Sequence, residues 1–223
     1  MAQPNSAPLS SPVSVIGSQF MSPYQRDIIV DRNPKGNIFI TDMSHNTMLK
    51  VKRCDTSFHY QRVLLDVDDK PIVTMRKKTM SEHDRWNVFM GDSKSTSDMI
   101  FTTKSHHVIQ FKTNVHVFLA NQTGSKNICD FKITGSWSKK NCTIYMGDTS
   151  TTIAQVNKMP SSENVKLVKD KFMVTIYPNV DYAFVVTLIG IVEAMKSSNT
   201  NGEVAAGSGV GAVLGAVIGS VFS

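Results

Sequence analysis

The feature that most constrains this 223-residue chain is a stretch near its C-terminal end that would be apolar on every face of a helix. It covers residues 181–195, and Glu193 is its only charged residue after Asp181. A helix without a polar face is either buried in a core or placed in a membrane. About 15 residues at ~1.5 Å each are shorter than the roughly 30 Å hydrocarbon core of a bilayer. We therefore expect a buried helix, with Asn179 or Asp181 as its N-cap.

Short segments of alternating apolar and polar residues fill the chain before this helix. Polar turns separate them, and β-branched residues are frequent in them. The segments are 38–40, 48–52, 62–65, 72–76, 86–90, 99–102, 108–112, 115–119, 129–133, 142–146, 153–156 and 172–177. About a dozen short strands at this spacing are typical of a sandwich or barrel, so we expect a mainly β fold whose sheet surrounds the helix.

Two sequence repeats support a sheet built from similar hairpins. Residues 88–93 resemble residues 144–149, and residues 42–52 resemble residues 66–76. The first repeat predicts a strand that enters a Gly-Asp turn, and the second predicts a hairpin. Two copies are too few for a solenoid, so the repeats belong to one sheet.

Composition divides the chain into three parts. Residues 1–23 are rich in Pro and Ser and predict a flexible arm, residues 24–196 form the folded domain, and residues 197–223 form a tail. The last part of the tail is uncharged and has a glycine at every fourth position, at Gly207, Gly211, Gly215 and Gly219. Such a ridge permits close packing between membrane helices, whereas glycine disfavours an isolated helix. A disordered tail and a weakly membrane-seeking helix both remain open.

The motifs give no indication of catalysis. The chain has no GxSxG elbow, P-loop, HExxH or GxGxxG motif. His106 and His107 are adjacent, and neighbouring side chains of a strand point to opposite faces, so they do not form a metal pair. The carboxylates of Asp66, Asp68 and Asp69 fit a β-turn better than a calcium loop. We therefore expect a protein that is not an enzyme and needs neither a cofactor nor a metal.

Charge and cysteine content bear on partners and location. The net charge of +6 favours anionic partners, although the basic residues are scattered. The chain lacks a recognition helix and basic-aromatic stacking motifs, so nucleic acid is disfavoured. Three cysteines without metal-ligand spacing fit a reducing compartment. We expect a cytoplasmic location, with peripheral association at the plasma membrane if the protein binds lipid.

The sequence resembles the plant LURP-one-related family, which shares the tubby-like fold with tubby and the phospholipid scramblases. The resemblance covers about residues 12–195, and its most specific part is 172–184. The other matching residues are 13–17, Tyr24, Asp27, 85–89, 129–132, 135–137 and 153–155.

The resemblance implies a closed antiparallel barrel of about twelve strands around one buried C-terminal helix. The buried residues of that helix would be Tyr182, Phe184, Val185, Leu188, Ile189 and Val192. The family's name also implies a role in plant defence or growth signalling. The series of acidic residues associated with calcium in scramblases is missing from the corresponding residues 169–172, which argues against calcium-dependent scrambling.

Basic residues are the strongest functional indication. The second repeat places Lys52 and Arg76 at equivalent strand ends, where they would share a cationic surface. We expect this surface to contact lipid headgroups through Lys50, Lys52, Arg53, Arg76, Lys77 and Lys78. The function expected is a binding module for an anionic phospholipid or a protein partner. The alternative is a scramblase-like protein anchored through its tail. The oligomeric state stays open.

Overall fold

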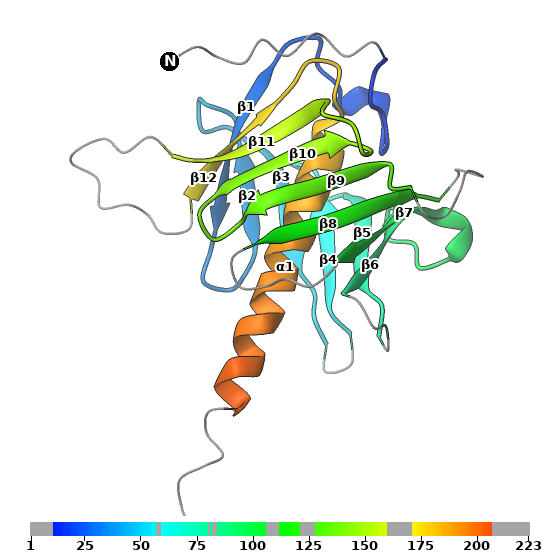
Figure 1. Cartoon of the computed structure of the whole chain (residues 1–223), viewed down its shortest axis with the longest axis vertical. Coiled ribbons are helices and arrows are strands. Elements are labelled where there is room, and N and C mark those ends of the chain that lie inside the picture. The colour runs from blue at the N-terminus through cyan, green and yellow to red at the C-terminus, as the bar shows by residue number, and fades with distance from the viewer. Residues whose placement is uncertain are drawn as a thin grey trace, which may run out of the picture. The chain divides into compact units, whose positions relative to one another are not determined.

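In the computed structural model, the described residues are 11–56, 59–79, 81, 84–105, 112–120, 128–159 and 171–206, with side chains described to Ser197. These residues form a closed antiparallel barrel of twelve strands and one long C-terminal helix (Figure 1). Each strand pairs with the next strand in the sequence, and β12 closes the barrel by pairing with β1. The expected fold class is confirmed.

The strands are β1 (Arg26–Arg32), β2 (Ile38–Thr41), β3 (Thr47–Arg53), β4 (Gln61–Leu65), β5 (Pro71–Lys77), β6 (Arg85–Met90), β7 (Met99–Ser105), β8 (Thr113–Leu119), β9 (Phe131–Ser136), β10 (Asn141–Met146), β11 (Thr152–Lys158) and β12 (Lys171–Ile176). Two short 3-10 helices are η1 (Ser18–Phe20) and η2 (Thr96–Asp98), and the C-terminal helix is α1 (Tyr182–Ala206).

The first strand was missing from the sequence-based assignment. Its centre reads Ile28-Ile29-Val30, and all three residues are buried, so the strand shows no alternation of apolar and polar residues. Most of the strand predicted at 108–112 falls outside the described residues, as do His106 and His107. The number of strands therefore agrees with the prediction, although their positions agree only in part.

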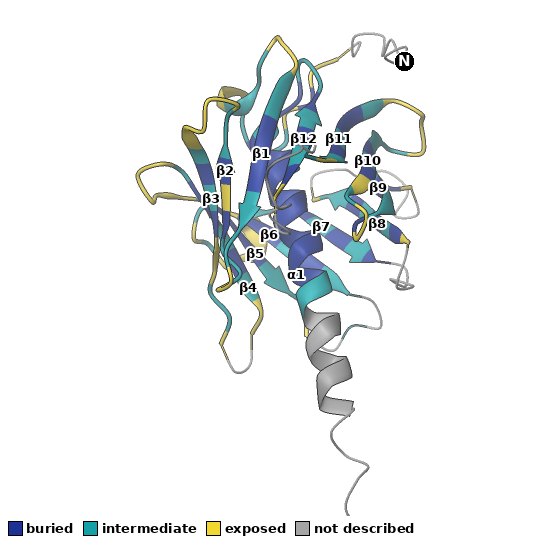
Figure 2. Ribbon diagram, turned by 90° about the vertical axis from the view of Figure 1, so that its left-hand side faces the viewer, coloured by how far each residue is buried: buried dark blue, intermediate teal, exposed yellow. Residues whose placement is uncertain are grey.

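The first part of α1 fills the interior of the barrel, as the dark blue residues of Figure 2 show. The Phe184 ring lies 5.4 Å from that of Phe101 and 4.8 Å from that of Phe131. A Cβ on Gly190 would lie 3.2 Å from Val51 Cγ1 and 3.4 Å from Met75 Sδ. The helix passes the inner faces of β3 and β5 closely enough to leave little room for a side chain there.

The helix residues named from the sequence differ in their burial. Phe184, Val185, Leu188, Ile189 and Val192 are buried, at 2% exposure or less.

Tyr182, the first residue of α1, was expected to be buried but is only partly buried. Its ring meets Phe20 edge-on at 5.6 Å between centroids, and the Arg26 guanidinium lies 5.2 Å from the ring centroid. Burial raises the pKa of the Tyr182 hydroxyl.

The helix also continues beyond the predicted end at Met195, to Ala206. The polar residues that follow Met195 contain no proline, which is the residue that interrupts a helix most strongly. In this later part the Ser197 hydroxyl donates to the carbonyl of Glu193 at 2.9 Å. Residues 207–223, which carry the predicted glycine ridge, lie outside the described part of the chain.

Part of the predicted flexible arm is instead held against the barrel. Val13 forms a parallel bridge with Val180, and Met21 forms an antiparallel bridge with Asp181. The side chains of Val13 and Ile16 are 5% and 7% exposed. The apolar residues after the Pro/Ser-rich start therefore belong to the domain, because they cover the beginning of α1.

The hairpin repeat is confirmed as a repeated structure. Asp42 accepts hydrogen bonds from the backbone N–H groups two and four residues ahead, at 2.9 and 2.8 Å, and Asp66 does the same at 2.9 Å each. His45 and Asp69 occupy the same turn position with φ of 64° and 61°. The acidic cluster at Asp66 is thus a turn, as predicted.

Candidate functional site

Five basic side chains lie in one row across neighbouring strands from β5 to β9. The Lys78 backbone N–H donates to the Arg85 carbonyl at 2.8 Å, and Arg85 pairs with Lys104 across β6 and β7. Lys104 pairs with His116, and His116 pairs with Lys132. We call Lys78, Arg85, Lys104, His116 and Lys132 the basic row. At about 4.8 Å per strand its backbone positions span roughly 19 Å.

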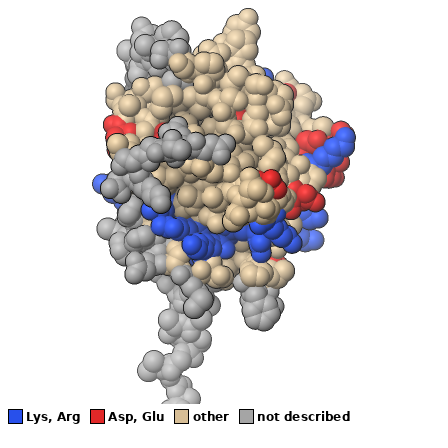
Figure 3. All heavy atoms as spheres, turned by 90° about the vertical axis from the view of Figure 1, so that its right-hand side faces the viewer, with Lys and Arg blue, Asp and Glu red and all other residues tan. Residues whose placement is uncertain are grey.

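The row faces outward because of the alternation of each strand. The residues before and after Lys104, His116 and Lys132 in the sequence are all buried. Successive side chains point to opposite faces of a sheet, so these three side chains lie on the outer surface. Figure 3 shows a band of Lys and Arg side chains across the side of the molecule on which β6 and β7 lie.

Little negative charge compensates the row. Among the described residues, no carboxylate forms an ion pair with Lys78, Arg85 or Lys104, and the Lys104 amine instead lies 4.9 Å from the centroid of the Phe118 ring. Lys132 is paired with Asp148 at 3.4 Å. Like charges directly opposite each other in a sheet are destabilising, so this row favours an anion bound from outside.

The six basic residues named from the sequence do not form a single patch. Lys50 and Lys52 lie on the outer face of β3, and Arg76 lies on the outer face of β5, with β4 between them. The Lys50 amine is paired with Asp69 at 2.9 Å, whereas Lys52 is exposed.

Two of the remaining predicted residues are paired with carboxylates, and the third joins the basic row. Arg53 Nε donates to Asp55 at 2.6 Å, and Lys77 is paired with Asp84. Lys78 is the member of the predicted set that the structure places in the basic row. Arg76 lies next to the row on the same face, since it pairs with Asn87, two residues from Arg85.

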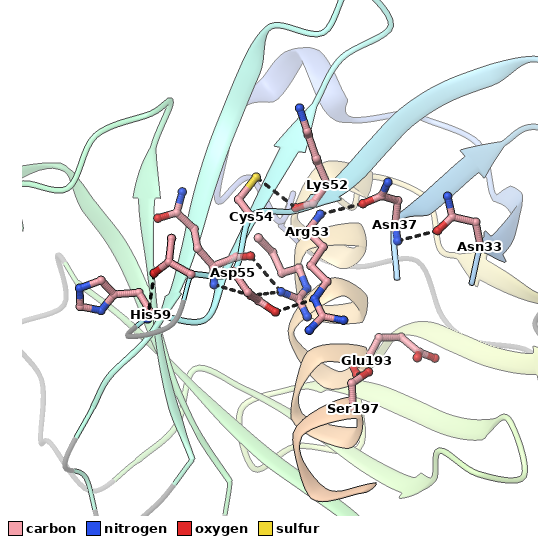
Figure 4. Close-up of polar contacts among 12 residues, drawn as sticks. Asn33, Asn37, Lys52, Arg53, Cys54, Asp55, His59, Glu193 and Ser197 are labelled. Carbon is pink, nitrogen blue, oxygen red and sulfur yellow. Dashed lines mark hydrogen bonds and ion pairs between the residues drawn. The ribbon is translucent and has the colours of Figure 1, made fainter. Parts of the chain in front are cut away.

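Arg53 and the buried Arg62 both form ion pairs with Asp55, and Figure 4 labels Arg53 and Asp55 of this cluster. Arg62 is 5% exposed, and burial lowers the pKa of its guanidinium while Asp55 raises it. Asp55 also accepts from the Gln61 backbone N–H at 2.9 Å. The cluster joins the ends of β3 and β4, so its cations are already satisfied and it serves the structure of the barrel rather than a ligand.

The fold and this surface can be compared with known proteins. The profile of the LURP-one-related family matches residues 30–193 of the chain. The chain belongs to the LURP-one-related family. Membership is consistent with a non-enzymatic role.

Individual relatives of this LURP-one-related protein come from Arabidopsis thaliana. Protein LURP-one-related 15 is 39% identical over 183 residues, which are 80% of this chain and 84% of the relative. Protein LURP1 is 37% identical over 194 residues, or 85% of this chain and 93% of the relative. The crystal structure of an Arabidopsis thaliana protein matches with a TM-score of 0.65 and 34% identity, covering 82% of this chain and 98% of that one.

Two further observations concern the described residues of this family member. Within the described ranges, no three His, Cys, Asp or Glu side chains are grouped so that they could hold a metal ion. The part of the chain that is described has no helix both long and apolar enough to cross a bilayer.

Sequence reasoning missed Arg85, Lys104 and Lys132 as candidate site residues of this family member. Each is a single basic residue in a short strand, and the residues lie far apart in the sequence. Only the pairing register brings them into one row. The sequence does show a basic residue between two positions that face the core. This pattern predicts that the residue lies on the outer face of its strand, but it does not predict which residues of the neighbouring strands lie beside it.

Proposed function

We propose that this LURP-one-related protein is a non-enzymatic module that binds anionic membrane surfaces through the basic row. The observation that carries the proposal is the alignment of Lys78, Arg85, Lys104, His116 and Lys132 in one row, in which Lys78, Arg85 and Lys104 form no ion pair with any described carboxylate. Each Lys or Arg near an anionic membrane contributes about 1 kcal/mol. Lys78, Arg85 and Lys104 therefore supply about 3 kcal/mol of attraction at low salt.

The geometry of the row also supports a surface as the partner. The side chains stand on the outside of a barrel wall, at strand spacing. A membrane presents many anionic headgroups at once, so a row can engage several of them. We propose that this binding serves plant defence or growth signalling, the roles that the family's name suggests.

The test is co-sedimentation of the full-length protein with vesicles of phosphatidylcholine alone and with added phosphatidylserine or a phosphoinositide. The proposal expects binding only to the anionic vesicles and weaker binding at high salt, because salt screens exposed charges. The double variant Arg85→Glu/Lys104→Glu removes two cations of the row. At about 1 kcal/mol each, the loss of two cations weakens vesicle binding roughly 30-fold, and the two added negative charges weaken it further.

The matched control is Lys70→Glu/Lys94→Glu, which changes the net charge equally. Both residues are exposed and lie in the β4–β5 and β6–β7 connections, at the end of the barrel opposite to Lys78 and Arg85. An equal loss in the two double variants would mean that net charge alone drives binding and would overturn the role of the row. Absence of vesicle binding by the unchanged protein would overturn the proposal and leave a protein partner as the ligand of this surface.

A further inference from the structure

A second surface feature lies apart from the basic row, on the outer face of β2, β3 and β4. It is a groove of about 500 Å³. Its lining residues are Asn37, Ile38, Phe39, Lys50, Val51, Lys52, Cys54, Val63, Leu65 and Asp69. Small-molecule sites in proteins commonly have volumes of about 300–1,000 Å³ and combine an apolar lining with a few polar groups.

The floor of the groove is apolar. Phe39 lies opposite Lys50 across β2 and β3, and Lys50 lies opposite Leu65 across β3 and β4. Lys52 lies opposite Val63 in the same way. The outer face of a barrel strand usually carries polar residues, yet Phe39 keeps 38% of its surface exposed here and lines the same groove as Val63 and Leu65. Phe39 on β2 and Val63 and Leu65 on β4 lie on either side of Lys50 and Lys52 on β3, and these three apolar side chains all line the groove.

One end of the groove has an amine that is already neutralised. Lys50 Nζ donates to Asp69 Oδ1 at 2.9 Å and to the Val67 carbonyl at 3.2 Å. These contacts hold the lysine in place along the groove and balance its charge. This end therefore offers no free positive charge to a ligand.

The other end has uncompensated donors. Lys52 is exposed and forms no ion pair within the described residues, and Figure 4 shows its side chain on the opposite side of β3 from Arg53. Asn37 lies beside it, because Asn37 Oδ1 accepts from the Arg53 backbone N–H at 2.9 Å. That bond uses the oxygen of the carboxamide and leaves its NH₂ group as a donor. A single positive charge and a neutral donor thus meet at one end of an apolar floor.

We propose that this groove binds a small amphiphilic anion. A carboxylate or phosphate group would contact Lys52 and Asn37, and the apolar body would lie against Phe39, Val63 and Leu65. Charge complementarity sets the orientation of the bound anion, since of the two ends of the groove only the Lys52 end carries a free cation. The groove shares no residue with the basic row, so this site does not depend on the proposed membrane binding.

The test is isothermal titration calorimetry of the full-length protein with dodecanoate and dodecyl phosphate, kept below their micelle concentrations. Dodecanol and dodecyl maltoside are the uncharged probes. Binding of either anion at least tenfold tighter than the uncharged probes is the expected result. A headgroup preference between dodecanoate and dodecyl phosphate identifies which anion the Lys52 end selects.

Two variants locate the site. Lys52→Gln removes the charge and is expected to weaken anion binding about tenfold, as for loss of a charged hydrogen bond, without changing the binding of uncharged probes. Phe39→Ser removes part of the floor and is expected to weaken all probes. Lys70→Gln is the matched control, because it makes the same charge change in an exposed turn outside the groove.

Equal affinities for charged and uncharged probes would overturn the proposal, as would unchanged anion binding in Lys52→Gln or no binding of either anion. The Arg85→Glu/Lys104→Glu protein separates this site from the basic row. It should keep amphiphile binding even where it loses vesicle binding, and Lys52→Gln should keep most of its vesicle binding.

Discussion

The carboxylate of Asp181 accepts a hydrogen bond of 2.7 Å from the backbone N–H of Ile16, 165 positions earlier in the chain. The same oxygen accepts from Val15 and Gly17, at 3.2 and 3.0 Å, and the second oxygen accepts from the Phe184 N–H at 3.0 Å. Asp181 is fully buried. One carboxylate therefore caps α1 and fixes the N-terminal segment beside it.

Asp181→Ala should destabilise the domain strongly. It removes the helix cap and leaves four backbone N–H groups without their anionic acceptor, so we expect a loss of about 3 kcal/mol or more in the free energy of unfolding. Urea denaturation followed by circular dichroism measures it. The control is Asp68→Ala, which removes an exposed carboxylate from the β4–β5 turn. Similar unfolding midpoints for the two variants would show that the Asp181 contacts contribute little.

Local chemistry made much of this fold predictable. The all-round apolar segment identified the central helix, and its cap was one of the two candidates, Asp181. The Gly-Asp turns were also confirmed: Gly91 and Gly147 both have positive φ, at 57° and 53°, and each follows a strand. These features depend on residues close together in the sequence, which is why the sequence was sufficient.

The basic row could not be predicted in the same way. Its members come from neighbouring strands from β5 to β9, and a shift of one residue in any pairing would move a lysine from the outer face to the core. Adjacent charges in the sequence, such as Lys77 and Lys78, suggested one patch. The structure separates them, because Lys77 pairs with Asp84 and Lys78 faces Arg85. The pairing register of the strands depends on contacts between residues far apart in the sequence, and it determines which side chains form the basic row.

Leu188→Asp should prevent stable folding. Leu188 is fully buried in α1, and the variant would place an unpaired carboxylate in the apolar interior. We expect no cooperative thermal transition, measured by circular dichroism at 222 nm. Val67→Asp is the control, since Val67 is 53% exposed and its replacement should change the melting temperature little. A Leu188→Asp protein that melts as the unchanged protein does would contradict the burial of the helix.

Gly135→Ala should be more harmful than Gly91→Ala. Gly135 has a φ of 131°, and an added Cβ would lie 2.8 Å from Cys142 Cα and closer still to the Asn141 carbonyl. Gly91 also has a positive φ, but a Cβ there would meet nothing within 4 Å. We expect a loss of about 1 kcal/mol for Gly91→Ala from backbone strain alone and several kcal/mol for Gly135→Ala. Equal losses in chemical denaturation would mean that β9 and β10 move apart easily.

Asp55→Ala should destabilise the barrel, because Arg62 would stay buried without its carboxylate partner. The guanidinium would keep its burial but lose its carboxylate partner, which typically costs about 3–5 kcal/mol. The double variant Asp55→Ala/Arg62→Met removes the unpaired charge as well, so it should recover much of the lost stability. Both effects are measurable by chemical denaturation. A double variant that is less stable than Asp55→Ala would show that Arg62 stabilises the barrel by contacts other than this ion pair.

The three cysteines should differ in their reactivity toward iodoacetamide. Burial raises the pKa of the Cys129 thiol, and the negative charge of Asp148 raises it further, so little of the reactive thiolate forms at slightly alkaline pH. Cys142 is also buried, whereas Cys54 is partly exposed. We expect peptide mass spectrometry to find Cys54 alkylated first, with Cys129 and Cys142 reacting only after unfolding in guanidinium chloride. Labelling of Cys129 at the rate of Cys54 in the folded protein would show that the chain around β9 opens readily.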